Sequence, residues 1–308
     1  MGLAFGSVVV GLAVLVFAGD LLVKGAVNLA LRLVIPALVV SLTVVAFGTS
    51  APELLVSIQA ILDGAPGLAL GNVVGSNTAN VLLVLGVPAI IAVMHTSGHD
   101  TRRDYVYMLG ATLLFILICL GGQLMWWHGL VLLGALAAVL VATFLASRET
   151  EVKVEGAEPT LPGWRLVAYL LLGLVGLPLG ASLLVDGATE IARAFGVSET
   201  VIGLTLVAAG TSLPELATTV MAAIRRHADV ALGNVIGSNL FNLLGIMGVA
   251  VLVGPVPVDR SFLTLDLWVM LGATLLLVPF VFLGRDLTRL WGVGLALLYV
   301  GYLVAVLG

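Results

Sequence analysis

A polar motif that occurs twice within apolar segments is the strongest constraint on how this chain can fold. Glu53 lies in TVVAFGTSAPELLVS, and Glu215 lies in TLVAAGTSLPELATT. Each motif is followed at the same distance by a partner segment, GNVVGSNTANVLLVLG and GNVIGSNLFNLLGIMG. Aligned without a gap, residues 43–86 and 205–248 share 21 identical residues in 44 positions, which indicates an internal duplication. We therefore expect the two halves of the chain to build one site together.

The composition places these motifs in a membrane. Hydrophobic residues make up 61% of the chain and charged residues only 10%, whereas a soluble domain has about 25% charged residues. The chain contains apolar segments of about 20 residues, the length at which a helix crosses a bilayer. We predict an all-α membrane protein with ten transmembrane helices, at Gly2–Leu31, Pro36–Leu62, Leu68–Met94, Tyr105–Gly121, Met125–Ala146, Trp164–Ala194, Ser198–Ile224, Val230–Val253, Phe262–Leu283 and Leu287–Leu307.

These spans divide into two halves with opposite orientations. Residues 1–146 hold the first five spans, residues 147–163 form a polar linker, and residues 164–308 hold the last five. Because five is an odd number, the second half must cross the membrane in the opposite sense to the first. Inverted repeats of this kind place a substrate site near the bilayer midplane and support alternating access.

The distribution of positive charge predicts the orientation. With loops placed alternately on the two sides, eleven of the 13 Lys and Arg residues fall on one side, which we assign to the cytoplasm. Both termini are then extracellular, the 147–163 loop is cytoplasmic, and the cell membrane is the expected location. Gly19–Ala30 aligns with Ala181–Ala192, so we expect the first span to be a counterpart of the sixth rather than a cleaved leader.

Glycine and proline in the duplicated motifs predict that the second and seventh helices are interrupted. Pro52 and Pro214 remove a backbone N–H and clash with the preceding turn. Backbone carbonyls freed at such a break must find partners or line a polar cavity. The oxygen atoms expected there are the carbonyls of Ala46, Phe47, Ala208 and Ala209 and the hydroxyls of Thr49, Ser50, Thr211 and Ser212.

The partner segments add polar and small residues at helical spacing. Residues four apart lie on one face of a helix, which gives a polar stripe in each half: Asn72, Ser76 and Asn80 in the first, and Asn234, Ser238 and Asn242 in the second. Glycines in the same segments allow close helix packing and bring the stripes towards the breaks: Gly71, Gly75, Gly233 and Gly237.

The chemistry of these residues favours a hard cation. A carboxylate at the membrane centre costs at least ~2.5 kcal/mol, and this chain has two at matched positions, Glu53 and Glu215. All the expected ligand atoms are oxygens, which select Ca²⁺, Na⁺ or Mg²⁺ over zinc or copper. Two carboxylates neutralise one divalent ion, and Ca²⁺ accepts about 6–8 oxygen ligands in flexible geometry. Calcium fits best.

The motifs GTSAPE and GTSLPE, with GNVVGSN and GNVIGSN after them, resemble the two alpha-repeats of prokaryotic sodium/calcium exchangers in the calcium/cation antiporter superfamily. The resemblance implies a monomeric secondary antiporter, not an enzyme, that uses no cofactor and exchanges Ca²⁺ for Na⁺ by alternating access. It also implies that the first and sixth helices slide across the core. The ion ligands that it implies are Glu53, Glu215, Asn80, Asn242, Thr49, Thr211, Ser50, Ser212, Ser76 and Ser238 and the carbonyls of Ala46 and Ala208.

The chain departs from that family at Asn242, where sodium/calcium exchangers carry an aspartate. The site then has one negative charge fewer, which leaves Ca²⁺/H⁺ exchange as the alternative. Proton-coupled calcium exchangers lack the GTS-x-PE motif, which favours Na⁺. Two other classes fit less well: an intramembrane aspartyl protease, whose GxGD motif is absent, and a cation channel, which would pass current without a counter-ion.

Overall fold

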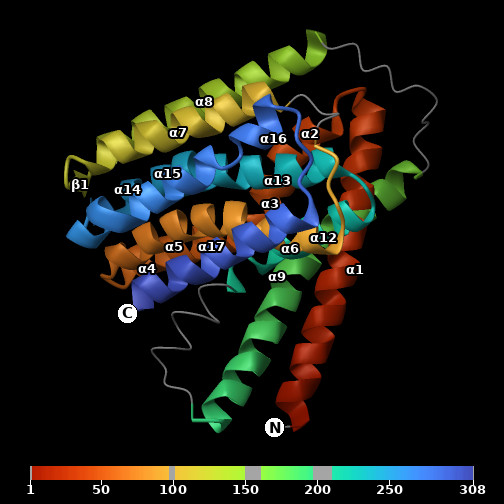
Figure 1. The fold of residues 1–308 in the computed structure, drawn as a ribbon, viewed down its shortest axis with the longest axis horizontal. Helices are drawn as coiled ribbons and strands as arrows, with labels where there is room; N and C mark the ends of the chain where they lie inside the picture. Colours follow the sequence, from red (N-terminus) through yellow and green to blue (C-terminus); the bar gives the residue numbers. More distant parts are fainter. Residues whose placement is uncertain (1, 97–100, 150–160, 197–209, 308) are drawn as a thin grey trace.

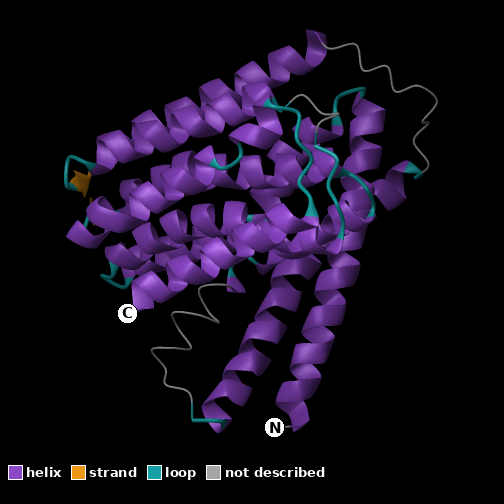
Figure 2. Ribbon diagram, in the orientation of Figure 1, coloured by secondary structure: helices purple, strands orange, loops and turns teal. Residues whose placement is uncertain are grey.

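The computed structural model describes residues 2–96, 101–149, 161–196 and 210–307, and it is helical almost throughout (Figures 1 and 2). Within these described ranges, seven helices are long and apolar enough to cross a membrane, and an eighth span results if the bent pair Ala37–Thr49 and Ala51–Leu62 is counted as one. The chain is therefore a multi-pass, all-α membrane protein, as predicted. One short antiparallel pairing was not predicted, between β1 (Gln123–Leu124) and β2 (Val256–Pro257).

Two of the ten predicted spans do not meet that criterion. Helix α7 (Arg102–Cys119) has 18 residues but opens with Arg102, Arg103 and Asp104. Helix α12 (Leu213–Ile224) is apolar but has only 12 residues, and the first part of its predicted span, 198–209, lies outside the described residues.

The remaining elements follow the predicted segments closely. In the first half they are α1 (Gly2–Leu33), α2 (Ala37–Val40), η1 (Ser41–Val45), α3 (Ala46–Thr49), α4 (Ala51–Leu62), α5 (Pro66–Ala79), η2 (Asn80–Val84), α6 (Gly86–Ile91) and α8 (Trp126–Glu149), where η marks a π-helical segment. In the second half they are α9 (Gly163–Ala194), α13 (Ala228–Leu240), η4 (Phe241–Ile246), α14 (Met247–Val253), η5 (Phe262–Asp266), α15 (Leu267–Leu275), α16 (Val278–Phe282) and α17 (Arg289–Leu307).

Helices α1 and α9 form a long antiparallel pair that runs steeply across the other helices and extends beyond them (Figure 1). Glycines make this contact close. A Cβ atom added to Gly180 would lie 2.9 Å from the backbone N of Leu15, and one added to Gly173 would lie 3.0 Å from the Cα of Leu22. Since only glycine leaves this space, the two backbones approach as closely as small-residue interfaces allow.

The chain bends at the first duplicated motif. The axes of the helices before and after Ser50 differ by 41°, and Ser50 has φ −86° and ψ 6°, outside the helical region. Ser212 has nearly the same conformation at the start of α12, with φ −87° and ψ 3°. Pro52 and Pro214 follow in the first turn of the next helix, where a missing N–H costs nothing.

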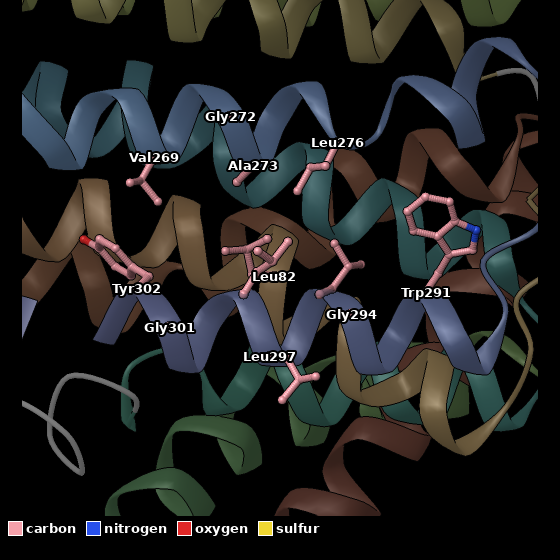
Figure 3. A pocket seen from close by; sticks show the side chains of 12 residues that line it. Leu82, Val269, Gly272, Ala273, Leu276, Trp291, Gly294, Leu297, Gly301 and Tyr302 are labelled. Atoms are coloured by element: carbon pink, nitrogen blue, oxygen red, sulfur yellow. The ribbon is translucent and has the colours of Figure 1, made fainter. Parts of the chain in front are cut away.

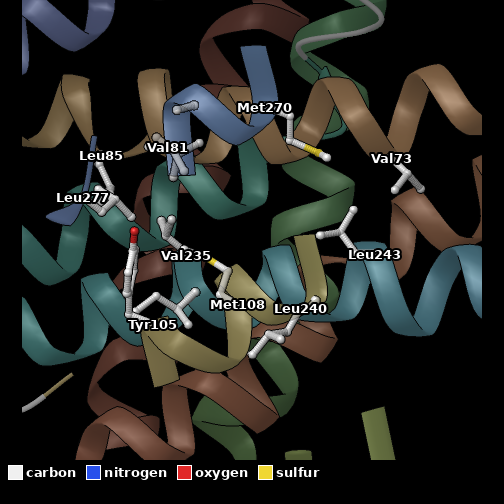
Figure 4. Packing of buried hydrophobic residues seen from close by; sticks show 14 of the residues in the cluster. Val73, Val81, Leu85, Tyr105, Met108, Val235, Leu240, Leu243, Met270 and Leu277 are labelled. Carbon is white, nitrogen blue, oxygen red and sulfur yellow. The ribbon is translucent and has the colours of Figure 1, made fainter. Parts of the chain in front are cut away.

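The apolar core lies between helices of both halves. Figure 4 shows Val73 and Val81 of the first half, Met108 and Tyr105 of α7, and Val235 and Leu243 of the second half packed together, and each is at most 1% exposed. Tyr105 also donates its hydroxyl hydrogen to the carbonyl of Thr274 at 3.1 Å. Packing across the two halves holds the partner segments in fixed positions beside the motifs.

Candidate ion-binding site

The two glutamates of the duplicated motif are the central feature of the site. Glu53 lies in the first turn of α4 and Glu215 in the first turn of α12, with exposed fractions of 1% and 0%. The Oε2 atom of each glutamate is buried and has no hydrogen-bond partner among the described residues. A buried carboxylate oxygen without a partner raises the free energy of the folded protein, and a bound cation would remove this cost. Both Oε2 atoms are therefore suited to bind a cation.

A direct hydrogen bond joins the motifs of the two halves. The Ser50 hydroxyl donates to Glu215 Oε1 at 3.0 Å. In the same region, the Thr49 hydroxyl donates to Asn234 Oδ1 at 3.4 Å. Ser50 and Thr49 of the first half therefore contact Glu215 and Asn234 of the second half directly.

Glycines of α13 let the second partner segment lie against the first motif. A Cβ atom on Gly237 would lie 2.3 Å from the carbonyl oxygen of Leu42, and one on Gly233 would lie 2.7 Å from that of Leu38. Helix α13 accordingly packs against α2, η1 and α3. The equivalent glycines of the first half are less crowded. A Cβ atom on Gly71 would lie 3.7 Å from Phe262 Cζ, and one on Gly75 would meet nothing within 4 Å in the described part of the chain.

The first asparagine of each stripe braces the glutamate helix. Asn72 donates to the carbonyl oxygen of Glu53 at 3.1 Å and to Ser57 Oγ at 3.0 Å. Asn234 does the same in the second half, donating to the carbonyl of Glu215 at 3.4 Å and to Thr219 Oγ1 at 3.1 Å. These amides hold the backbone of each glutamate rather than its carboxylate, so they position the carboxylates.

The last asparagine of each stripe lies in a π-helical segment, a feature frequent at functional sites. Asn80 opens η2 and Asn242 lies in η4, and both are at most 1% exposed. Asn80 Oδ1 and both amide atoms of Asn242 have no hydrogen-bond partner among the described residues. Unpaired amide oxygens at this depth are suited to a cation ligand.

The other predicted ligands differ in what the structure describes. Ser76, Ser212 and Ser238 are buried, and Thr211 is half-buried. Ala208 lies outside the described residues, as does Ala209. The Ala46 carbonyl is not free, contrary to expectation: it accepts hydrogen bonds from Ser50 N at 3.0 Å and Thr49 Oγ1 at 3.3 Å. The helical bonding continues to Ser50, so the carbonyl that Pro52 deprives of its i+4 donor is that of Gly48.

Sequence reasoning missed a pair of asparagines next to the site. Asn239 Oδ1 accepts a hydrogen bond from Asn80 Nδ2 at 3.0 Å, and Asn239 Nδ2 donates to the carbonyl of Asn77 at 3.4 Å. These bonds tie α13 to α5 and orient the Asn80 amide so that its oxygen stays unpaired. The signal was present in the sequence, because the GSN triplet ending in Asn77 and Asn239 occurs in both halves.

The donor set is made of oxygen atoms. Among the described residues, no group of three or more His, Cys, Asp or Glu side chains lies close enough together to hold a metal ion. What converges instead is two carboxylates with amide and hydroxyl groups. Such a set can neutralise and exchange hard cations.

Comparison with known proteins gives consistent results. The model of the sodium/calcium exchanger protein family matches residues 3–145 and again 165–308. The sodium/calcium exchanger MaX1 of Methanosarcina acetivorans is 35% identical over 97% of both chains, and the inner membrane protein YrbG of Escherichia coli is 36% identical over 88% of this chain and 86% of its own. A structure of the sodium-calcium exchanger NCX_Mj, soaked with zero Na⁺ and Ca²⁺, superposes with a TM-score of 0.86 at 32% identity over 99% of each chain.

Proposed function

Because the chain belongs to the sodium/calcium exchanger protein family, we propose that it is a secondary antiporter that exchanges Ca²⁺ for Na⁺ by alternating access. The observation that carries this proposal is the pairing of two buried glutamates, Glu53 and Glu215, one from each half, each with an unpartnered carboxylate oxygen. Two such charges match one divalent ion or a set of monovalent ions. The protein is a transporter rather than an enzyme and needs no resident cofactor.

The proposed ligands are those that the sequence indicated, with one exception. Glu53 and Glu215 bind Ca²⁺ centrally, with the side chains of Asn80 and Asn242 beside them. The remaining ligands complete the Ca²⁺ and Na⁺ sites: Thr49, Ser50, Ser76, Thr211, Ser212, Ser238 and the carbonyl of Ala208. The Ala46 carbonyl is left out, because it already accepts hydrogen bonds from Ser50 N and Thr49 Oγ1. Support comes from the unpaired oxygens of both glutamates and of both asparagines at this depth in the protein.

Exchange follows from competition for one site. Ca²⁺ on the two carboxylates, or Na⁺ ions spread over the flanking oxygens, would neutralise the charge of Glu53 and Glu215. The empty site keeps two negative charges in a low-dielectric region, where moving them against apolar helices is costly. The protein therefore changes its side of access only when loaded, which couples the two ion flows.

The proposed architecture is ten transmembrane helices in two inverted repeats, 1–146 and 164–308, joined by a cytoplasmic linker at 147–163. The two separate matches to the family model support this division. The chain is then a monomer in the cell membrane with both termini outside. Helices α1 and α9, which pack closely on each other, slide across the remaining helices to change access.

Proton coupling is the second candidate, and Asn242 favours it. An aspartate at this position would give the site a third negative charge, whereas Asn242 is neutral and buried with no hydrogen-bond partner among the described residues. With two charges only, one Ca²⁺ can exchange for two protons on Glu53 and Glu215.

Uptake of ⁴⁵Ca²⁺ into proteoliposomes distinguishes Ca²⁺/Na⁺ exchange from Ca²⁺/H⁺ exchange. Vesicles loaded with Na⁺ are compared with vesicles loaded with choline, the latter with and without an imposed pH gradient. We expect uptake only with the Na⁺ gradient. Uptake that follows the pH gradient alone would make the protein a calcium/proton exchanger, and a Ca²⁺ current that needs no counter-ion would make it a channel.

A further inference from the structure

An apolar groove lies between α15 and α17, and neither Glu53 nor Glu215 lines it. It has a volume of about 830 Å³, within the range of roughly 300–1,000 Å³ typical of small-ligand sites. Figure 3 shows Gly272 and Leu276 on one wall, Gly301 and Gly294 on the other, and Leu82 of η2 between them. Tyr302 and Trp291 stand at the two ends. The groove is thus elongated, with an aromatic residue at each end.

The groove opens on the outer surface of the helix bundle. Leu297 and Leu298, which line it, are 65% and 52% exposed, and the span formed by α17 is only 11% buried. A Cβ atom added to Gly272, Gly294 or Gly301 would meet nothing within 4 Å. In a membrane protein such a surface faces hydrocarbon, so an occupant of the groove has to be apolar along most of its length.

Positive charge lies at the Trp291 end. Arg289 is the first residue of α17 and Arg285 precedes it by four residues, and both are exposed. Asp286, between them in sequence, is paired with His95 Nδ1 at 2.8 Å. The Trp291 ring packs edge to face on Phe280, with the ring centroids 5.2 Å apart. Tryptophan is enriched at the headgroup level of a membrane. Basic residues beside an intramembrane groove attract anionic lipid headgroups.

We propose that the groove between α15 and α17 binds an anionic phospholipid. One acyl chain lies along Gly272, Gly294 and Gly301, and the phosphate lies at Arg285 and Arg289. Leu82, in the wall of the groove, is two residues after Asn80, so the bound chain contacts the helix that carries a proposed ion ligand. The site is separate from ion exchange and is tested without it.

Native mass spectrometry of the intact protein in detergent provides the test, with phosphatidylglycerol or phosphatidylcholine added in equal amounts. We expect one phosphatidylglycerol to be retained in preference to phosphatidylcholine. Gly272→Leu and Gly301→Leu fill the groove and should each remove this adduct. Gly110→Leu is the matched control, because Gly110 occupies the equivalent position of the first half, also with nothing within 4 Å. The double variant Arg285→Gln/Arg289→Gln should weaken retention about fivefold for each arginine.

Three outcomes would overturn the proposal. The first is equal retention of the two lipids. The second is retention of phosphatidylglycerol that neither leucine variant reduces while the proteins remain folded. The third is a dimer that dissociates in Gly272→Leu and Gly301→Leu, which would assign the groove to a second copy of the chain.

Discussion

At the scale of single residues, the proposed ion site depends on two carboxylates, Glu53 and Glu215, and no ion pair is formed by either of them among the described residues. Glu53→Gln or Glu215→Gln removes one of the charges that balance a divalent ion while keeping the side-chain shape. We expect Ca²⁺ affinity to fall about tenfold to a hundredfold, because a contact with a charged group contributes roughly 1.5–3 kcal/mol. The measurement is ⁴⁵Ca²⁺ uptake against Ca²⁺ concentration. Glu190→Gln, an exposed glutamate of α9, is the control. Wild-type uptake by both site variants would contradict the proposed ligands.

A second residue-scale prediction concerns the neutral position Asn242. The variant Asn242→Asp adds a charge where both amide atoms are unpaired, so no existing hydrogen bond is lost. We expect half-saturation of uptake at a Ca²⁺ concentration about tenfold lower, equivalent to ~1.4 kcal/mol. Asn80→Asp is the contrasting variant, since it replaces the amide donor to Asn239 Oδ1 by a second acceptor and should lower stability by about 1–3 kcal/mol. Unchanged Ca²⁺ dependence in Asn242→Asp would exclude this residue from the site.

At the scale of elements, the α1–α9 pair depends on glycine. The variant Gly180→Val places a Cβ atom 2.9 Å from Leu15 N and 3.0 Å from the Gly11 carbonyl, both of which are backbone atoms that cannot rotate away. We expect a loss of about 1–3 kcal/mol in stability, the usual cost of overpacking, seen as a lower Tm in detergent. Gly6→Val on α1 is the control, because its Cβ would meet nothing within 4 Å. Equal Tm values for the two variants would mean that the helices do not pack this closely.

At the scale of the whole molecule, one ion pair makes the two halves unequal. Asp20 of α1 is paired with Lys24 Nζ at 2.8 Å and with Arg225 at the end of α12. The duplication places Ser182 and Asp63 at the equivalent positions, which cannot form an ion pair. If the two halves exchange roles during alternating access, the contact between Asp20 and Arg225 stabilises only the state in which it is formed.

Asp20→Asn should therefore shift the population away from the present conformation. Partly exposed ion pairs contribute about 0.2–1 kcal/mol, which corresponds to a shift of up to roughly fivefold. Spin labels at Gly6→Cys on α1 and Gln59→Cys on α4, in a Cys119→Ser background, would report the distance between these helices. Asp186→Asn is the control, because Asp186 accepts a bond from Ser182 of its own helix at 3.1 Å. Identical distance distributions in Asp20→Asn and in the unmodified background would show that this pair has no such effect.

Much of this organisation could be read from the chain itself. The hydrophobic composition predicted a membrane protein. Its spans were expected to be helical, because a helix satisfies its backbone hydrogen bonds within one segment in hydrocarbon. The matched glutamates, prolines and asparagines identified the duplicated motif, and Pro52 predicted the bend at Ser50, because a proline cannot donate to the preceding turn. The stripes ending at Asn80 and Asn242 were predictable from spacing alone, because residues four apart lie on one face of a helix.

Tertiary packing decided what lies beyond local spacing. The sequence does not indicate that Ser50 bonds to Glu215 or that the Ala46 carbonyl keeps its helical donor. The repeated GSN triplet draws attention to Asn239, but it does not indicate that this residue orients the Asn80 amide. Each of these contacts depends on the separation and rotation of whole helices, which are set by the summed packing of many side chains across both halves. The groove between α15 and α17 and the ion pair of Asp20 with Arg225 arise in the same way, from elements far apart in the chain. The sequence determined which groups enter the membrane, and the packing of the helices determined which of them meet.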